Sequence, residues 1–268
     1  MLNLYRRVYV VAKRLAQPFN TRDKEMSERR LGVYAHPDDE FMTSYALTEE
    51  GVEAFVFMAT DGRASSINNR RDAEFVRSGK RREEAEASLT NLKVPDDPEH
   101  RVYAGLPDGE LARHREELVR SLAEMIVQQE IDTVVTTGAD GFDKHDDHVT
   151  MFEAVVAAIN AVRESDGRIV NHITLNSRGE GNLVIEPTAE MRHQKLQSMI
   201  CNYSQHDVRE LQAGEQTDDR IIDGEFAIGK KFDEEFADYW PLLRRETYDV
   251  VTQKASPQPE PVLAGQIS

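Results

Sequence analysis

Two short segments of the sequence concentrate the residue types that bind metal ions and move protons. They read Ala35-His36-Pro37-Asp38-Asp39-Glu40 and, from residue 138 to residue 148, Gly-Ala-Asp-Gly-Phe-Asp-Lys-His-Asp-Asp-His. His36 and Asp39 can converge on one ion from a tight turn. His145 and His148 are three residues apart and therefore fall on one side of a starting helix. Two histidines and one carboxylate, with a position left open for water, form the donor set of a catalytic zinc site.

The chemistry that such a site would perform is hydrolysis. A zinc ion lowers the pKa of a water molecule toward neutrality, and Asp38 lies beside the expected ligands, free to accept a proton from that water. Taken singly, an aspartate at a strand end, such as Asp38 or Asp39, is more often a helix N-cap. The metal site is favoured because three of the eight histidines fall in these two segments, among carboxylates.

Both segments follow short apolar runs that are typical of buried strands. Strands are predicted at 31–35, 53–60, 101–103 and 132–137, and helices at 39–50, 79–92, 110–129 and 147–163. Beyond residue 170 the pattern predicts strands at 173–175 and 183–185 and a helix at 188–201. The alternation predicts an α/β fold with a Rossmann-like, largely parallel sheet flanked by helices. Ligands bind such a sheet at the carboxyl ends of its strands, where both segments lie.

The chain is expected to divide into three parts. Residues 1–30 predict a basic amphipathic helix and a polar connector, with the helix either packed on the outside of the domain or docked on an anionic membrane or a partner. Residues 31–252 are expected to form a single catalytic domain, in which residues 61–78 form a long polar loop. Residues 253–268 are rich in proline and predict a disordered tail.

The composition excludes several classes of protein. The 268 residues include 33 Lys and Arg against 49 Asp and Glu, and the net charge of −16 disfavours binding to nucleic acid. The single cysteine, Cys201, excludes an intrachain disulfide and a cysteine-based zinc finger. No apolar stretch approaches the roughly 20 residues of a membrane span. The sequence therefore predicts a cytoplasmic protein without a transmembrane segment.

The first segment and the marks that follow it resemble a known family, the zinc-dependent N-acetylglucosamine deacetylases of the LmbE/PIG-L type. The supporting marks are Thr60-Asp61-Gly62, Arg81-x-x-Glu84, Leu106-Pro107-Asp108-Gly109, the His145 and His148 pair, Lys195, and Ser204-Gln205. The resemblance covers residues 31 to about 206. It implies a hydrolase that removes the N-acetyl group from a substrate containing N-acetylglucosamine.

The roles of individual residues follow from the resemblance by position. The zinc ligands are expected to be His36, Asp39 and His148, with one Zn²⁺ per chain. Asp38 is expected to be the general base, His145 the group that stabilises the oxyanion, and Asp147 the residue that orients the His145 imidazole. Arg63, Arg81 and Asp108 are the expected substrate-binding residues. The resemblance thus implies a small-molecule substrate, an N-acyl amino sugar or its conjugate. It also implies a possible homo-oligomer, because trimers and hexamers are common in the family.

Some of these positions depart from the family pattern or have a structural alternative. Asp146, Arg63 and Asn202 stand where the family often has proline, glutamate and histidine. Arg81 can instead form an ion pair with Glu84 on one helix face, and Asp108 can serve only the turn that contains it. Two other functions stay open beside the deacetylase, namely a metal-dependent phosphoesterase and a non-catalytic sugar-binding protein.

Overall fold

The computed structural model describes residues 27–64, 80–176, 181–202, 220–222, 225–227 and 246–250. The predicted N-terminal helix, most of the predicted loop at 61–78 and the proline-rich tail lie outside the described residues. So does Ser204-Gln205.

A seven-stranded sheet forms the centre of the described chain, with its strands in the order β3-β2-β1-β4-β5-β9-β6. The strands are β1 (Glu28–Tyr34), β2 (Val52–Thr60), β3 (Arg101–Leu106), β4 (Thr133–Thr137), β5 (Asn171–Leu175), β6 (Leu183–Ile185) and β9 (Glu246–Val250). All pairs among the first five strands are parallel, namely β1 with β2, β1 with β4, β2 with β3, and β4 with β5. β9 is antiparallel to both β5 and β6. The predicted largely parallel sheet is therefore confirmed. β7 (Arg220–Ile222) and β8 (Glu225–Ala227) form a separate antiparallel pair.

Helices occupy the connections between the strands, and all but the short α6, which was not predicted, lie close to the predicted ranges. They are α4 (Lys80–Asn91), α5 (Arg115–Gln128), α6 (Gly141–Lys144), α7 (Asp146–Asp166) and α8 (Ala189–Cys201). The predicted helix 39–50 is a 3-10 turn, η1 (Asp39–Thr43), followed by a short helix, α2 (Ser44–Thr48). The predicted helix 110–129 likewise begins with a 3-10 turn, η3 (Leu111–His114).

β1 begins at Glu28, three residues before the predicted strand, although the added residues are all charged. The Arg30 side chain is only 14% exposed and pairs with the carboxylates of Glu28 and Glu49. Arg29 pairs with Glu53 on β2, at 2.9 Å. Partner carboxylates thus compensate the charges, which lets residues with the appearance of a polar connector extend the strand.

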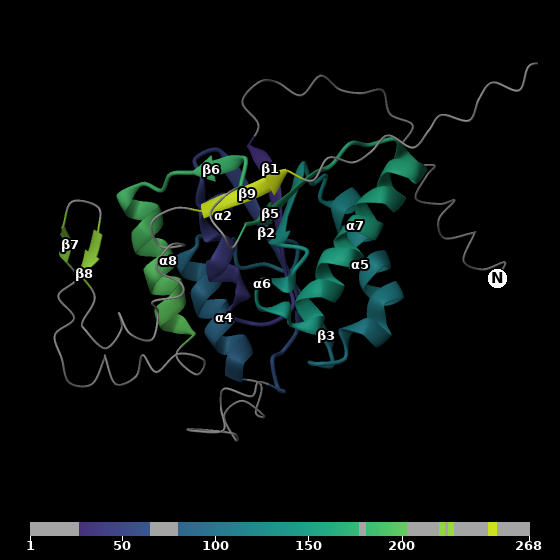
Figure 1. Cartoon of the computed structure of the whole chain (residues 1–268), viewed down its shortest axis with the longest axis horizontal. Helices are drawn as coiled ribbons and strands as arrows, with labels where there is room; N and C mark the ends of the chain where they lie inside the picture. The colour runs from purple at the N-terminus through teal and green to yellow at the C-terminus, as the bar shows by residue number, and fades with distance from the viewer. Residues whose placement is uncertain are drawn as a thin grey trace, which may run out of the picture.

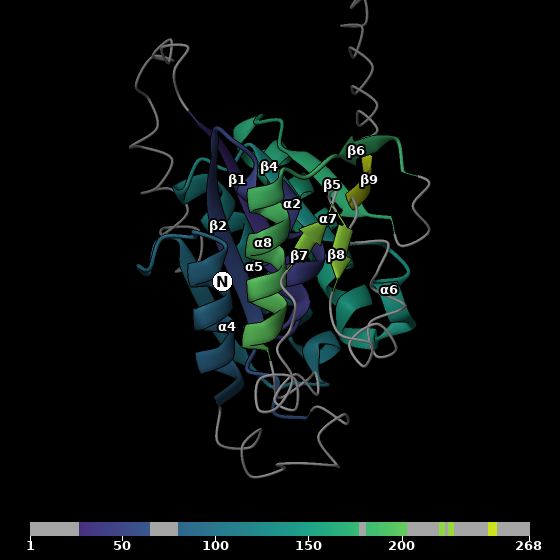
Figure 2. The ribbon, with the colours of Figure 1, turned by 90° about the vertical axis from the view of Figure 1, so that its left-hand side faces the viewer.

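Alternating side chains of the sheet build one core on each of its faces. Tyr34, Val56 and Met58 belong to a cluster that includes residues of α2, α4 and α8. Leu31, Val33, Phe55 and Phe57 belong to the opposite cluster, with residues of α5 and α7. Figure 1 shows the sheet between these two helix layers, and Figure 2 shows α4 and α8 side by side on one of them.

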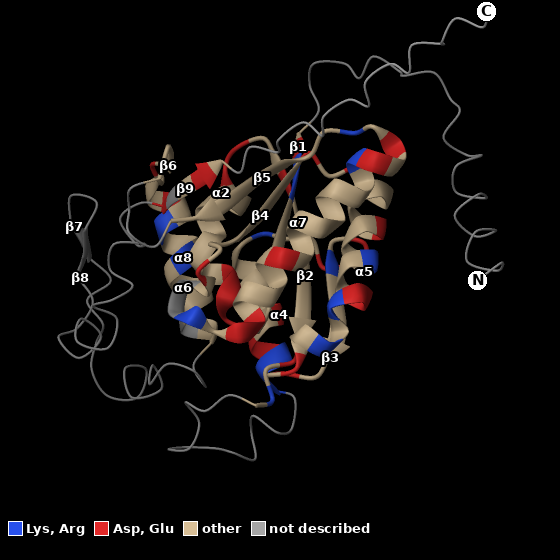
Figure 3. Cartoon of the chain, turned by 45° about the vertical axis from the view of Figure 1, so that its right-hand side comes forward, with Lys and Arg blue, Asp and Glu red and all other residues tan. Residues whose placement is uncertain are grey.

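The outer surface of α5 is charged, while its inner face supplies apolar contacts. Acidic and basic residues are interspersed along this helix (Figure 3). Leu118, Leu122 and Ile126 on its other side are fully buried. Among the described residues, no helix combines the length and apolar character needed to cross a membrane.

The order of the strands places both chemistry-bearing segments at one point. The chain runs outward from β1 to β2 and β3 on one side of the sheet, and from β4 to β5 on the other. A crevice forms outside the carboxyl ends of the strands where the direction of winding reverses. β1 and β4 are neighbours at this reversal, and His36 and the 138–148 segment follow their ends.

A buried ion pair between α8 and β9 also hydrogen-bonds to the backbone of the η1 and α2 segment that follows β1. The Lys195 ammonium lies 2.5 Å from a Glu246 carboxylate oxygen, and neither side chain is exposed to solvent. Lys195 also donates to the Met42 carbonyl, at 3.2 Å, and Glu246 accepts from the backbone N–H of Tyr45. Burial lowers the pKa of Lys195 and raises that of Glu246, each opposed by the charge of the other.

Replacing Lys195 with methionine is expected to destabilise the protein strongly, because it leaves the Glu246 carboxylate buried without its cation. The expected loss is about 3–5 kcal/mol in the free energy of unfolding, measured by urea titration. Lys93→Met is the matched control, since Lys93 and its partner Glu190 are both 68% exposed. A loss in Lys195→Met no larger than in the control would contradict the importance of the buried pair.

Candidate metal centre

His36 and His148 face each other where β1 and β4 end. The Nδ1 atom of His36 lies 3.2 Å from the Nε2 atom of His148. A carboxylate oxygen of Asp39 lies 3.1 Å from the same Nε2 atom. All three residues are buried, and each offers a ligand atom within 4.8 Å of the other two. Residues 112 positions apart are brought together here, as the strand-end argument predicts.

The outer nitrogen of each ring has an acceptor, which fixes where the ring protons lie. His148 Nδ1 is 3.0 Å from the Gly141 carbonyl oxygen. His36 Nε2 is 3.2 Å from an Asp147 carboxylate oxygen and 3.1 Å from one of Asp108. Carbonyl and carboxylate oxygens only accept hydrogen bonds, so these outer nitrogens carry the protons. The inner nitrogens then present lone pairs to each other and to Asp39, and three acceptors that meet in this way suit a cation.

The electrostatics of the cluster also favour positive charge. Burial raises the pKa of Asp39, but His148 and His36 outweigh burial and hold this pKa well below its usual range. Burial lowers the pKa of His36, but hydrogen bonds to Asp108 and Asp147 outweigh this and raise it to about 9. Near neutral pH the raised pKa adds a second proton to His36, on Nδ1. A divalent metal bound at Nδ1 would displace this proton, while the Nε2 proton stays on Asp108 and Asp147.

Asp38 lies between the two ligands of the first segment in a strained conformation. Its φ of 97° and ψ of −18° fall in the left-handed region, which costs about 1–3 kcal/mol for a residue other than glycine. Its carboxylate is 17% exposed and lies 2.7 Å from the Arg81 guanidinium. Burial raises the pKa of Asp38 to about 7, although Arg81 lowers it. The two adjacent aspartates thus have pKa values shifted in opposite directions.

Arg81 lies behind Asp38, and its side chain is 3% exposed. Besides the Asp38 carboxylate, its guanidinium donates to the backbone carbonyl of Pro37 and, at 2.9 Å, to that of Gly62. Arg81 thus forms an ion pair with Asp38, on a segment distant in the sequence, which its helical spacing did not predict. The contacts place Arg81 against the turn that carries Asp38.

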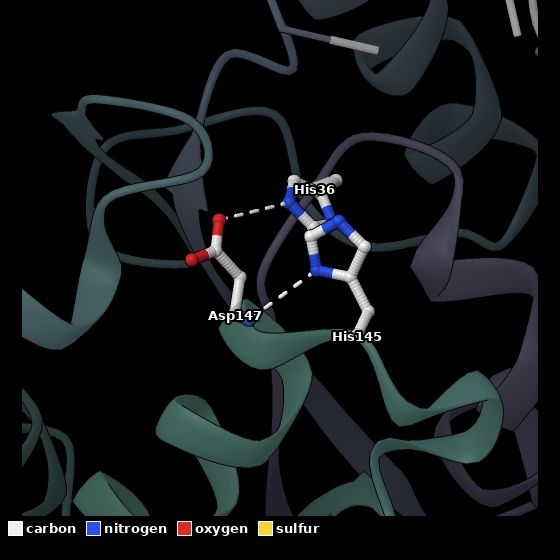
Figure 4. Close-up of side chains that lie close together, drawn as sticks. All are labelled: His36, His145 and Asp147. Atoms are coloured by element: carbon white, nitrogen blue, oxygen red, sulfur yellow. Dashed lines mark hydrogen bonds and ion pairs between the residues drawn. The ribbon is translucent and has the colours of Figure 1, made fainter. Parts of the chain in front are cut away.

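His145 and Asp147 approach the cluster from the start of α7 (Figure 4). The exposed His145 is the N-cap of this helix, and its Nδ1 atom accepts the backbone N–H of Asp147 at 3.2 Å. The Asp147 carboxylate points to His36 and accepts the backbone N–H of Gly109, at 2.7 Å, and of Leu111, at 3.1 Å. Asp147 thus contacts the His145 imidazole through its backbone N–H, while its carboxylate contacts His36.

Asp108 and Arg63 have different surroundings. The Asp108 side chain is 7% exposed and accepts the backbone N–H of Ala64, at 2.6 Å, in addition to its contact with His36. It therefore does more than form its turn. Arg63 is 57% exposed and pairs with Asp61 at 2.5 Å, outside the cluster.

Three contacts of the site were not predicted from the sequence, although Asp108 was expected to bind substrate and Glu40 belongs to the first segment. The Gly141 carbonyl and the Asp108 carboxylate hold the two imidazoles, and Glu40 accepts the backbone N–H of Asp38 at 2.8 Å. Backbone carbonyls carry no signal in a sequence. Glu40 stands inside the first segment, and its position directly after the expected ligand was the available signal.

The proteins of known structure that share this fold include a deacetylase and a hydratase. The N,N'-diacetylchitobiose deacetylase of Pyrococcus horikoshii matches with a TM-score of 0.59 and 17% identity, over 84% of this chain and 84% of that one. GalB, the 4-carboxy-2-hydroxymuconate hydratase of Pseudomonas putida KT2440, matches with a TM-score of 0.56 and 16% identity, over 86% of this chain and 99% of that one. At these identities the likeness establishes the fold alone.

Sequence comparison narrows the assignment to a family. A curated relative from Schizosaccharomyces pombe, a probable N-acetylglucosaminyl-phosphatidylinositol de-N-acetylase, is 25% identical over 145 residues. The match spans 52% of this chain and only 55% of that relative. The family model described as PIG-L, GlcNAc-PI de-N-acetylase, matches residues 31–159, which include every residue of the cluster. Residues 31–159 thus form a domain match to the PIG-L, LmbE-like, deacetylase family.

Proposed function

We propose that this protein is a zinc-dependent hydrolase that removes the N-acetyl group from a substrate containing N-acetylglucosamine. The observation that carries the proposal is the pair of imidazole nitrogens of His36 and His148, 3.2 Å apart beside the Asp39 carboxylate, with Asp38 on the same turn. The match of residues 31–159 to the PIG-L family supports the reaction class.

His36, Asp39 and His148 would hold one Zn²⁺ per chain. When bound, the ion lowers the pKa of water and polarises an acyl oxygen. A second group of possible ligands, His36, His145 and Asp147, shares His36 with the first. Both Asp147 oxygens already accept hydrogen bonds, from Gly109, Leu111 and His36. This supports one ion in the first group and makes the two-metal phosphoesterase the weaker alternative.

Asp38 would move the proton that the reaction requires. Water adds to the acyl carbon as Asp38 takes one of its protons, the carbon–nitrogen bond then breaks, and Asp38 returns the proton to the amine nitrogen. The raised pKa of Asp38, about 7, suits a group that both accepts and donates a proton near neutral pH. The contact with Arg81 holds the carboxylate in place.

His145 would stabilise the negative charge that develops on the acyl oxygen. Because its Nδ1 atom accepts the Asp147 N–H, the proton of the neutral ring lies on Nε2, which is then a hydrogen-bond donor. The exposure of His145 fits contact with a substrate. Arg63, on the exposed loop, is the proposed contact to the sugar, whereas Arg81 and Asp108 serve Asp38 and His36. The cytoplasmic location and a trimeric or hexameric assembly stay predictions.

The zinc-loaded protein is expected to release acetate and a free amine from at least one N-acetylglucosamine derivative. The panel contains the free sugar, a chitobiose, a thiol-conjugated glucosamine and a lipid-linked sugar, with acetate and amine each quantified. Release of inorganic phosphate from phosphate esters, without release of acetate, would favour the phosphoesterase. Binding of a sugar without turnover would favour the non-catalytic alternative.

Elemental analysis of the purified protein is expected to find about one zinc per chain. His148→Ala is expected to lose the metal, because the Nε2 lone pair is a ligand in the proposed site. His114→Ala is the matched control, since His114 lies outside the cluster and pairs with Glu117. A His148→Ala protein that keeps a full equivalent of zinc would remove His148 from the ligand set.

Asp38→Asn is expected to keep the metal and lose a factor of about 10²–10⁴ in kcat, which is the usual contribution of a general base. Steady-state kinetics and zinc content, measured on the same preparation, separate the two effects. Asp166→Asn, at the exposed end of α7, is the control and is expected to match the wild type. Wild-type kcat in Asp38→Asn would exclude Asp38 as the base.

A further inference from the structure

We propose that Glu40 is a positioning residue of the site, which holds the backbone of Asp38 in its left-handed conformation and so sets the direction of the Asp38 side chain. The inference rests on the proposed function, because Asp38 matters as the base of that reaction. It assigns to Glu40 a role distinct from those of the ligands and the base beside it.

The turn that carries Asp38 is closed by its two flanking ligands. The backbone N–H of His36 donates to the Asp39 carboxylate at 2.8 Å, and the N–H of Asp39 donates to the His36 carbonyl at 3.2 Å. Asp38 stands inside this closed turn with a φ of 97°. The two ligands can therefore keep their places only while Asp38 stays in a backbone region that most residues avoid.

Glu40 provides the acceptor for the Asp38 N–H. A Glu40 carboxylate oxygen lies 2.8 Å from the Asp38 nitrogen, reaching back over two residues. Arg81 holds Asp38 from another direction, because it donates to the Asp38 carboxylate at 2.7 Å. The backbone and the side chain of the proposed base are thus each held by one charged residue.

The other side of Glu40 is fixed to the helix pair α4 and α8. Its second carboxylate oxygen accepts from the Asn202 amide at 2.7 Å, and Asn202 is the C-cap of α8. Ser88 of α4 also hydrogen-bonds to Glu40, and the Ser88 and Ser198 hydroxyls are 2.5 Å apart. Asn202 is one of the positions where the sequence departs from the family pattern. Figure 2 shows the two helices side by side.

Glu40 is completely buried, so its carboxylate must be stabilised by hydrogen-bond donors around it. The residue is 0% exposed, and burial of a carboxylate without compensation is costly. The donors around it come from three places, namely the Asp38 backbone, α4 and α8. The Glu40 carboxylate thus connects the turn that carries Asp38 to α4 and α8 through hydrogen bonds, and the position of these helices helps to set the position of the turn.

The test separates the reach of the Glu40 side chain from its charge. Glu40→Gln keeps one oxygen as acceptor for the Asp38 N–H, and its NH₂ group can donate to the buried Asn202 Oδ1, which has no hydrogen-bond partner, once the Asn202 amide rotates. Its kcat is expected to stay within about threefold of the wild type. Glu40→Asp keeps the charge but withdraws the acceptor by one methylene, and its kcat is expected to fall about 10–100-fold with little change in KM and in zinc content. Glu83→Asp, on the exposed side of α4, is the control. The opposite order of the two Glu40 variants would overturn the proposal.

A second experiment tests whether Glu40→Asp lowers kcat through Asp38 or by disturbing the structure in general. In an Asp38→Ala background, Glu40→Asp is expected to cause no further loss of kcat, because the group that it positions is gone. An equal loss in both backgrounds would overturn the proposal. If Glu40→Asp does not fold, Asn202→Ala, which removes a donor that holds Glu40, takes its place with the same expected direction.

A crystal structure of metal-free Glu40→Asp tests the inference without an activity assay. The φ of Asp38 is expected to leave the left-handed region, or the Asp38 carboxylate to leave Arg81, while Glu40→Gln keeps both. An unchanged Asp38 in Glu40→Asp would overturn the positioning role. If the wild-type protein hydrolyses none of the N-acetylated sugars but Asp38 moves as expected, the proposed function fails and the role of Glu40 stands.

Discussion

The imidazoles of His36 and His148 bring two lone pairs to within 3.2 Å of each other beside the Asp39 carboxylate. Such a meeting of acceptors needs a cation between them, either a metal ion or the second proton that the raised pKa of His36 provides. The parallel pairing of β1 with β4 brings the two strand ends together, and the Gly141 carbonyl and the carboxylates of Asp108 and Asp147 hold the outer face of each ring. The pairing of the strands thus fixes where the two rings lie, and the acceptors around them fix which nitrogens face each other.

The sequence predicts the features that depend on local periodicity. Apolar runs mark the strands, helical spacing marks α5 and α7, and the rule that ligands bind at strand ends brings His36 and His148 together. Contacts between distant side chains are not encoded in spacing. The pairing of Arg81 with Asp38, the contact of Asp108 with His36, and the extension of β1 through Arg29 and Arg30 each depend on a partner that only the folded chain supplies.

The adjacent residues Asp38 and Asp39 show how one residue type can serve two roles. Asp39 faces two imidazoles, which hold its pKa well below the usual range against the effect of burial. Asp38 has a left-handed backbone and pairs with Arg81, and burial raises its pKa to about 7 in spite of that cation. Two carboxyl groups with pKa values pushed apart by their environments are typical of a ligand or stabiliser beside an acid–base group. The conformation of one residue therefore separates the two roles.

The residues that hold this turn do not all lie in the part of the chain that defines the family. The match to the PIG-L family ends at residue 159, and it includes the expected ligands, Asp38, Glu40 and Arg81. Asn202, which donates to Glu40, and the Lys195–Glu246 pair, which contacts the Met42 carbonyl and the Tyr45 N–H, lie beyond it. The chemistry-bearing turn is thus fastened from the later part of the chain, through α8 and β9. Changes in that part can therefore alter how firmly Asp38, the proposed base, is held.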